Sequence, residues 1–434
     1  MTDLPDALAR AALPASILDV LRRLGEAGHR SWLVGGAVRD LLLGRVREGT
    51  DFDVATPATP QAVSALFPKV IPTGIDHGTV TVIARGEHVE VTTFRGEGAY
   101  EDGRRPSSVT FHGDLEADLA RRDLTINAIA WDPLAGELRD PFGGQADLAA
   151  RRVRAVGDPA ARFGEDGLRA LRAVRFAAQL GFALDPPTEA AIPGVLPVVR
   201  KVSVERIADE LVKTATAPDP ARGLALLAST GLLGAVLPEL AAVPAAAREH
   251  AGRVAGALAP EPSLRLAALL HVLPAARVGP LLLALRLSRR LADEAGALAA
   301  AHRCRLANTT PPAAGEPVRR WLSAAGRARG PALAALARAE AEASPPGARA
   351  AALAEASALA AAVDALGPGV PLEPRDLALD GGALMRLLGI PPGPEVGLAL
   401  RHLLDRVLAD PGLNSASALE AEARAWWAGR AGRL

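Results

Sequence analysis

Hydrophobic and polar residues follow two different periods in the first third of the chain. Apolar residues at helical spacing predict helices at 17–28 and 37–44, the second of which ends at Gly44. An apolar run and period-two alternation of Val, Thr and Phe predict strands at 31–36, 51–56, 78–84 and 88–94. This mixture of periods is typical of a small domain in which a sheet carries flanking helices.

The pattern changes after these strands. Segment 95–121 is polar and rich in Gly and Pro, and it is longer than an ordinary connection, so we expect a functional or disordered loop there. From about residue 160 the chain reads as helices, with proline-rich breaks near 217–220, 309–317 and 344–347 as candidate hinges. The pattern therefore predicts an α+β head followed by an all-helical remainder.

Composition narrows the choice of environment. The 434 residues carry 49 basic and 49 acidic side chains, so any basic surface for nucleic acid must be local. The single cysteine, Cys304, cannot form an internal disulfide, which suits a reducing compartment. No leader-like N-terminus and no apolar run of about 18 to 20 residues is present, so we expect a soluble, cytoplasmic protein without a membrane segment.

Two acidic residues and a glycine turn carry the first candidate chemistry. On a strand, Asp51 and Asp53 would point to the same face, and paired carboxylates suit Mg²⁺. The glycine turn that ends at Gly36 lets backbone N–H groups approach an anion, and Arg39 follows one helical turn later. Glu90, on a nearby predicted strand, could complete the metal ligands. Each feature alone also occurs at ordinary solvated strand ends and turns, but their combination favours a metal-bridged triphosphate site.

Two later motifs add arginines and carboxylates. In R-R-D-L-T-I-N, Arg122 and Asp123 precede an apolar segment, a pattern that is equally typical of a helix start with capping chemistry. The second motif spaces four charged residues three apart on one broad helix face: Asp166, Arg169, Arg172 and Arg175. Its simpler interpretation is a solvated stripe of ion pairs.

Taken in order, these motifs resemble one known family. G-G-x-V-R-D, D-x-D, R-R-D-x-T-x-N-A and E-D-x-x-R-x-x-R-A-x-R-F are similar to motifs of the class II tRNA nucleotidyltransferase and bacterial poly(A) polymerase family, within the polymerase-beta-like nucleotidyltransferase superfamily. The resemblance runs from about residue 31 to 182 and returns more weakly at 380–414. Four ordered motifs make the resemblance specific.

The resemblance implies both an architecture and partners. A head with a small mixed sheet would carry catalysis, and helical parts after it would hold the acceptor end of tRNA. In this chain the parts would be a head at 1–145, a neck at 146–215, a body at 216–345 and a tRNA-binding tail at 346–434. The implied reaction is attack by a tRNA 3′-hydroxyl on the α-phosphate of CTP or ATP, with release of pyrophosphate and assistance from two Mg²⁺ ions.

The resemblance also implies a role for each motif residue. Asp51 and Asp53 would bind the metal ions, with Glu90 as a further catalytic carboxylate. Gly36 and Arg39 would hold the triphosphate, and Arg122 would contact the nucleotide. The base pocket would be lined by Asp166, Arg169, Arg172 and Arg175. Segment 95–121 would correspond to the family's flexible loop.

Base selection has a physical reason at this pocket. Adenine and cytosine both show an amino donor beside a ring-nitrogen acceptor, whereas guanine and uracil show the reverse order. Asp166 would accept from the amino group and Arg169 would donate to the ring nitrogen, because a mismatched edge would leave buried polar groups unpaired. We therefore expect Asp166→Ala to lose base discrimination more than metal binding.

Two positions depart from the family pattern. Many relatives carry a phosphohydrolase domain that needs a His-Asp pair after the neck, but here Val272 follows His271. We interpret His271 as a core histidine and expect a body without a functional His-Asp site. Gly167 stands inside the predicted base-reading helix, where glycine costs about 1 kcal/mol relative to alanine.

Rival activities remain open at this point. An intact segment 95–121 argues against an enzyme that adds only CC, and the C-terminus AWWAGRAGRL lacks the strongly basic extension typical of poly(A) polymerases. Complete CCA addition and addition of the terminal A alone are not separated by the sequence. A non-catalytic RNA-binding protein is the alternative of another class, and Asp51 with Asp53 argues against it.

Overall fold

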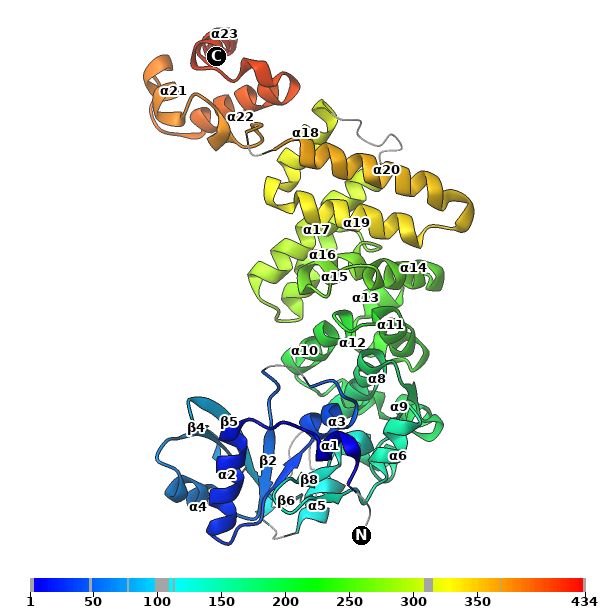
Figure 1. The fold of residues 1–434 in the computed structure, drawn as a ribbon. Helices are drawn as coiled ribbons and strands as arrows, with labels where there is room; N and C mark the ends of the chain where they lie inside the picture. The colour runs from blue at the N-terminus through cyan, green and yellow to red at the C-terminus, as the bar shows by residue number, and fades with distance from the viewer. Residues whose placement is uncertain are drawn as a thin grey trace. The chain divides into compact units, whose positions relative to one another are not determined.

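The computed structural model describes residues 4–46, 49–75, 78–97, 109–111, 114–307, 315–367 and 369–431. The chain divides into two compact units, Met1–Ala242 and Val243–Leu434, which we call unit 1 and unit 2 (Figure 1). The strands lie in unit 1, and the described part of unit 2 is built from helices. The predicted α+β class, with a mixed-sheet head followed by helices, is confirmed.

A seven-stranded mixed sheet forms the centre of the head. Its strands lie in the order β3-β4-β5-β2-β1-β8-β9. Their bounds are β1 Trp32–Val34, β2 Asp53–Thr56, β3 Val70–Gly74, β4 Thr79–Ala84, β5 Glu87–Thr93, β8 Ala130–Asp132 and β9 Glu137–Arg139. Only β2 and β5 are parallel among these pairs, and their register places Asp53 opposite Glu90. The sheet thus brings two acidic side chains from distant segments together.

Short helices surround this sheet. They are α1 Asp6–Ala9, α2 Ala15–Glu26, α3 Gly36–Leu42, α4 Pro60–Leu66, α5 Leu115–Ala120 and α6 Gly144–Ala149. Helix α2 buries Ile17, Val20, Leu21 and Leu24, the face that the helical spacing predicted, and it contacts β4 and β5. Helix α3 starts directly after β1, so the chain turns sharply between them.

Segment 95–121 is more ordered than a long loop where the structure describes it. Strands β6 Arg95–Glu97 and β7 Val109–Phe111 pair in an antiparallel ladder, and α5 follows with Asp114 accepting a hydrogen bond from the backbone N–H of Glu116. Residues 98–108 and 112–113 lie outside the described residues, so the expectation of a loop there stays a prediction.

The rest of unit 1 is mainly helical. It comprises β10 Arg152–Val153, α7 Pro159–Glu165, α8 Leu168–Leu180, β11 Ala183–Leu184, α9 Pro186–Val199, α10 Val204–Ala215, α11 Pro220–Ser229, α12 Leu232–Val236 and α13 Pro238–Ala241. Helix α8 packs against α10 and α11 and buries most of its residues. The charged side chains that α8 still presents are therefore aligned by a firmly packed helix.

The prediction for Gly167 is wrong. Gly167 does not lie inside a helix: Asp166 ends α7, and Gly167 is the residue before α8 begins. A Cβ atom at Gly167 would lie 2.6 Å from the backbone N of Val199. The glycine allows the start of α8 to approach the end of α9, which explains a residue that helix propensity alone would disfavour.

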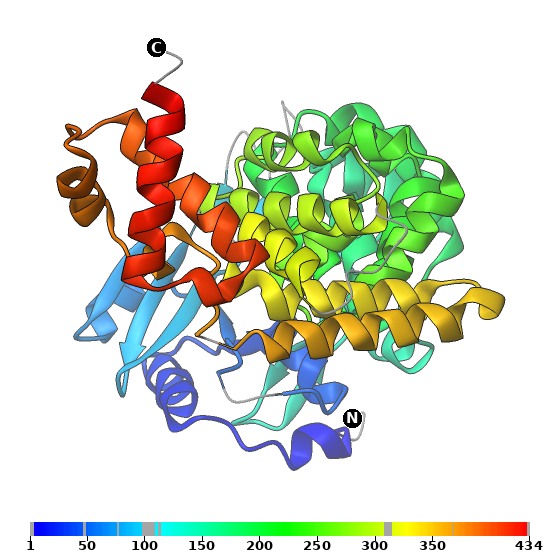
Figure 2. The same ribbon diagram turned by 90° about the horizontal axis from the view of Figure 1, so that it is seen from above.

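Unit 2 is formed by ten α-helices in its described residues. They are α14 Ala245–Gly256, α15 Pro262–Leu270, α16 Ala275–Ala284, α17 Arg289–Ala307, α18 Glu316–Ala325, α19 Gly330–Ala343, α20 Pro346–Ala365, α21 Gly381–Leu388, α22 Pro394–Ala409 and α23 Ala416–Ala431. Helices α19 and α20 lie side by side (Figure 2). None of the described helices is both long and apolar enough to cross a membrane.

The predicted domain boundaries are not tested by this division. The proline-rich break near 217–220 lies between α10 and α11, inside unit 1, and the break near 344–347 lies between α19 and α20. The break near 309–317 falls mostly outside the described residues. The four-part division into head, neck, body and tail therefore stays a prediction.

Candidate active site

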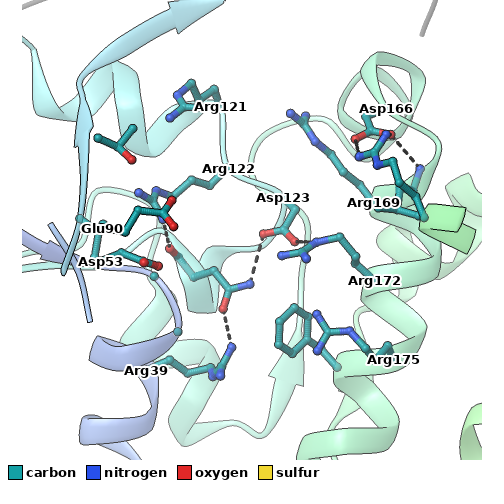
Figure 3. A pocket seen from close by; sticks show the side chains of 18 of the residues that line it. Arg39, Asp53, Glu90, Arg121, Arg122, Asp123, Asp166, Arg169, Arg172 and Arg175 are labelled. Carbon is teal, nitrogen blue, oxygen red and sulfur yellow. Dashed lines mark hydrogen bonds and ion pairs between the residues drawn. The ribbon is translucent and has the colours of Figure 1, made fainter. Parts of the chain in front are cut away.

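A cavity of about 550 Å³ in unit 1 collects most of the predicted site residues (Figure 3). It is lined by side chains from β1, α3, β2, β5, α8 and α10 and from the segment around η2 Thr125–Asn127. Eight arginines and four carboxylates are among the lining residues. Such an excess of guanidinium groups suits a polyanionic ligand.

The acidic wall of this cavity is formed by Asp53 and Glu90. Both line the cavity, and they are paired across β2 and β5. Burial raises the pKa of Asp53 to about 6; the charge of Glu90 adds to this rise and that of Arg122 opposes it. Asp53 is half-buried and Glu90 is exposed, and two neighbouring carboxylates of this kind are stabilised by a divalent cation, so the pair fits oxygen-ligated metal binding.

Gly35 lets the backbone turn from β1 into α3 close to the acidic wall. It has φ +75° and precedes the first residue of α3, Gly36. A Cβ at Gly35 would lie 3.1 Å from Nη1 of Arg122 and 3.7 Å from Oδ2 of Asp53. The left-handed backbone and the close neighbours both favour glycine, which places the β1–α3 turn directly beside the carboxylate.

Asp51 is placed differently from the expectation. Strand β2 begins at Asp53, so the argument that both carboxylates share one strand face does not hold for Asp51. Asp51 is exposed and lines a second cavity together with Phe52, Glu87 and His88. Its charge nevertheless contributes to raising the pKa of Asp53, so the two carboxylates interact electrostatically.

Arg122 lies next to the acidic wall and is held by the buried carboxylate of Asp118. Asp118, only 1% exposed, accepts from Arg121 Nη2 at 2.6 Å and from Arg122 Nη2 at 3.3 Å. Burial raises the pKa of Asp118, but the two arginines outweigh this and lower it below its usual range. Asp118 therefore stays ionised and positions Arg122 against Asp53.

A hydrogen-bonded chain connects α3 with α8 across the cavity floor. Arg39 donates to the Oδ1 of Asn127 at 2.8 Å, Asn127 donates to Asp123 at 3.2 Å, and Asp123 accepts from Arg172 Nε at 2.6 Å. Arg39 also donates to Asp40. Burial raises the pKa of Asp123, but the charge of Arg172 and the hydrogen bonds from Arg172 and Asn127 lower it by more. The pKa therefore lies below the usual range. This network fixes residues of two motifs relative to one another.

The two residues expected to read the base are each bound to another partner. Asp166 accepts from Arg206 of α10 at 2.6 and 3.3 Å, and Arg169 pairs with Glu165 and donates to the carbonyl of Arg162. Asp166 precedes α8, so the four predicted charges do not form one helical row. All four still line the cavity, and they lie together on the wall opposite Asp53 and Glu90 (Figure 3).

Arg175 contributes to this wall mainly as a buried group. It donates to Glu210 of α10 at 2.5 Å and to Gln179 at 2.6 Å, and its guanidinium lies 3.7 Å from the ring centroid of Phe176. Burial lowers the pKa of Arg175, and the charge of Glu210 opposes this shift. Through its ion pair with Glu210, Arg175 holds α8 against α10.

Sequence reasoning missed Arg206, Glu210 and Asp118. Arg206 and Glu210 stand four residues apart on one face of α10, a signal that a charged pair shares that face, but nothing local indicates contact with α8. Asp118 falls inside the segment that was interpreted as a loop. Their partners lie three to forty residues away, so packing decides these contacts.

Family models match two parts of the chain. Residues 31–154 match the poly(A) polymerase head domain, and residues 181–243 match a region described as a probable RNA- and SrmB-binding site of polymerase A. The CCA-adding enzyme of Geobacillus stearothermophilus is 48% identical over 286 residues, which cover 65% of this chain and 68% of that protein. The CCA-adding enzyme of Anoxybacillus flavithermus is 52% identical over 224 residues, or 52% of this chain and 55% of that protein.

Solved structures give the same picture over a longer span. The Bacillus stearothermophilus CCA-adding enzyme in complex with CTP has a TM-score of 0.77 and 35% identity, covering 96% of this chain and 98% of that one. The Thermotoga maritima CCA-adding enzyme in complex with tRNA has a TM-score of 0.65 at 18% identity, covering 98% of each chain, and shows the fold alone.

Proposed function

Because this chain belongs to the class II tRNA nucleotidyltransferase family, we propose that the cavity of unit 1 is the active site of a CCA-adding enzyme. The protein adds CMP and AMP from CTP and ATP to the 3′ end of tRNA without a template, and each transfer releases pyrophosphate. Its partners are the tRNA acceptor end and the two nucleotides. The lone cysteine and this substrate support a cytoplasmic location.

One observation carries this assignment. A single cavity joins the carboxylate pair Asp53 and Glu90 to a wall of arginines that also contains Asp166. Carboxylates beside a triphosphate can hold the divalent cations that nucleotidyl transfer requires. Arginines neutralise the phosphates, and a carboxylate on the opposite wall can accept a hydrogen bond from the amino group of a base. A protein that only bound RNA would have no need for the first of these parts.

Divalent cations are used by the family, and we assign Mg²⁺ here. The ligands on offer are carboxylate oxygens, which Mg²⁺ prefers, and we propose that Asp53 and Asp51 hold the ions with Glu90 beside them. When bound, Mg²⁺ supplies Lewis-acid stabilisation of the attacking and leaving oxygens. Asp51 would need to turn from its exposed position toward Asp53, and a bound divalent cation would offset the repulsion between the two carboxylates.

A backbone turn and two arginines act on the triphosphate in different ways. Gly36 begins α3 directly after Gly35, whose Cβ position lies 3.7 Å from Oδ2 of Asp53, so we propose that the backbone of this turn approaches the triphosphate closely. Arg122 lies next to the acidic wall and supplies direct charge. Arg39 is 5% exposed and already donates to Asp40 and Asn127, so we assign it to orienting the turn and adding positive potential.

Base selection requires an exchange of partners. Asp166 must loosen its contact with Arg206 to accept from the amino group of C or A, and Arg169 must turn from Glu165 to donate to the ring nitrogen. We assign Arg206 as a positioning residue that holds the carboxylate of Asp166 in place until a base arrives. Arg172 and Arg175 support this wall through Asp123 and Glu210.

We propose that the helical parts after the head bind tRNA as predicted. A neck at 146–215 would carry the base-reading residues, a body at 216–345 would follow, and a tail at 346–434 would contact the tRNA. The family match at 181–243, described as an RNA-binding region, supports an RNA contact that begins within this neck.

The assignment is tested by incorporation of labelled nucleotides. Purified protein is incubated with Mg²⁺, labelled CTP or ATP, and tRNA that lacks the whole CCA end, lacks only the terminal A, or is complete. We expect both labels on the first tRNA and ATP label alone on the second. Label from ATP on the second tRNA only would mean A addition, long tails would mean a poly(A) polymerase, and no incorporation would favour a non-catalytic RNA-binding protein.

A further inference from the structure

Unit 2 contains a cluster of three histidines around one glutamate, which we call the histidine cluster. His250 comes from α14, His271 follows the last residue of α15, His302 comes from α17, and Glu340 comes from α19. Their side chains are 24%, 6%, 0% and 16% exposed, respectively. Four helices that are far apart in sequence thus place chemically active groups in one buried region.

The ring nitrogens of the three histidines all face the same carboxylate. Nε2 of His250 lies 2.7 Å from Oε1 of Glu340. The corresponding Nε2 atoms of His271 and His302 lie 3.7 and 3.5 Å from Oε2. Neighbouring rings are edge to face, with centroids of His271 and His302 5.3 Å apart. The arrangement is convergent, as in a metal-binding site, rather than a stack of packed rings.

One hydrogen bond orients His271 for coordination. Its Nδ1 lies 2.7 Å from the backbone carbonyl of Ala268, which can only accept, so Nδ1 carries the hydrogen. In the neutral ring the lone pair is then on Nε2, which faces Glu340. Metal-bound histidines usually donate their second ring N–H to such an acceptor, because this fixes the tautomer and the ring plane.

The charge balance of the cluster calls for a cation. The side chain of Glu340 is 16% exposed, and both of its carboxylate oxygens have imidazole nitrogens close by. The ion-pair partners described for Glu340 are all imidazoles. A buried carboxylate is stable only with a matching positive charge, which an imidazolium or a metal ion can provide.

We propose that His250, His271 and Glu340 bind one transition-metal ion of the Zn²⁺ type, with His302 beside them. Ligands at about 2.0–2.1 Å from a tetrahedral Zn²⁺ stand about 3.3 Å from one another. Nε2 of His271 lies 3.7 Å from Oε2 of Glu340 and Nε2 of His250 lies 2.7 Å from Oε1, on either side of that value, and the ligand atoms of the three residues lie within 4.8 Å of one another. Imidazoles and a carboxylate, without thiolates, match Zn²⁺, Co²⁺ or Ni²⁺ rather than Mg²⁺.

This site is independent of the nucleotidyl-transfer site. The three protein ligands come from α14, the end of α15 and α19, so the ion would tie these helices together. Val272 takes no part in the donor set, so the lack of an aspartate at that position does not remove it. His271 is buried as expected of a core histidine, but it also faces a carboxylate that this interpretation did not anticipate.

Binding of Co²⁺ to the metal-free full chain, prepared without a histidine tag, tests the proposal. Four-coordinate Co²⁺ with imidazole ligands gives intense visible d–d bands, whereas a six-coordinate carboxylate site gives weak ones. We expect one equivalent of Co²⁺ with intense bands, displaced by Zn²⁺, in the natural chain and in Asp53→Asn, which removes a carboxylate of the head. The bands should disappear in Glu340→Gln and His271→Ala.

Two further variants keep this test decisive. His250→Ala removes the most exposed ligand, so it should fold, and we expect it to weaken Co²⁺ binding by at least about tenfold. His402→Ala is the matched control, because His402 pairs with Glu422 at 3.0 Å elsewhere in unit 2 and should leave the bands unchanged. Absence of intense bands in the natural chain, or bands that persist in Glu340→Gln, would overturn the proposal and leave a protonated histidine network.

Discussion

The cavity of unit 1 and the histidine cluster of unit 2 both gather nitrogen donors around carboxylates, but they do so in opposite ways. In the cavity, eight arginines and four carboxylates line about 550 Å³ of space, and Asp166 and Arg169 are bound to Arg206 and Glu165, which we propose they exchange for a base. In the cluster, three imidazoles face one buried carboxylate directly. A large, charge-rich cavity suits substrates that enter and leave, whereas a compact group of imidazoles around one carboxylate suits a resident ion.

The largest expected effect is at the acidic wall. Asp53→Asn should lower the rate of CMP and AMP incorporation by about 10³-fold, or about 4 kcal/mol, because it removes a carboxylate that holds a catalytic ion. Single-turnover incorporation measures this. Asp19→Asn, on α2 and paired with Arg85, is the matched control and should keep full activity. A loss of less than about tenfold in Asp53→Asn would contradict the assignment of the cavity.

The buried network that links α3 to α8 should show itself in stability and its pH dependence. Asp123→Asn removes the closer charged partner of Arg172, leaving Glu210 at 3.8 Å, and should cost about 3 kcal/mol at pH 7. The folded pKa of Asp123 is below its unfolded value, so this stabilisation is complete above about pH 5 and is lost as pH falls through the folded pKa.

Urea unfolding from pH 7 to pH 3 checks this second expectation. The difference between the natural chain and Asp123→Asn should stay constant down to about pH 5 and then narrow. A difference that widens in acid would mean that Asp123 is protonated in the folded protein, contrary to its pairing with Arg172.

The base-reading wall should respond in selectivity. We expect Asp166→Ala to reduce discrimination of C and A against U and G by about 10²-fold, since the amino group loses its buried acceptor. Arg206→Gln should change selectivity in the same direction by about tenfold, because it only positions Asp166. Competition between labelled nucleotides measures both variants. Unchanged selectivity in Asp166→Ala, with an intact rate for CTP, would refute the role of this wall.

The smallest expected effects are on stability, at two glycines near Asp166. Gly167→Ala should destabilise the chain by about 1–3 kcal/mol, because the new Cβ meets the backbone of Val199. Gly164→Ala, on α7 with nothing within 4 Å of its Cβ position, should stabilise by up to about 1 kcal/mol. Thermal unfolding compares the pair. Equal effects of the two substitutions would show that the approach of α8 to α9 does not constrain Gly167.

Local patterns predicted much of the head correctly. The strands at β1, β2, β4 and β5 and the helices α2 and α3 were expected within two or three residues, because alternation and helical spacing reflect burial on one face. The start of β2 at Asp53 was missed by two residues, and this small error changed the orientation assigned to Asp51. Strand ends are poorly encoded by alternation, since hydrogen bonding to the neighbouring strand decides where pairing begins.

The candidate site was predicted in content but not in connectivity. Asp53, Glu90, Arg122 and the charges around α8 do line one cavity. Their partners Asp118, Arg206 and Glu210 were not anticipated, because a salt bridge between helices depends on how the helices pack and leaves no periodic signal in either one. Whether each residue acts as the family resemblance implies remains for the variants above.

By itself, the sequence determined the α+β head, its helical continuation and the ordered motifs that identify the family, because these depend on local spacing and residue type. Only the tertiary structure decided that Asp53 and Glu90 are neighbours, that Asp166 is held by Arg206, and that three histidines meet at Glu340. These contacts join residues 37 to 90 positions apart. Folding brings such residues together through the burial of other side chains. The sequence around each residue therefore does not indicate which distant residue it will contact.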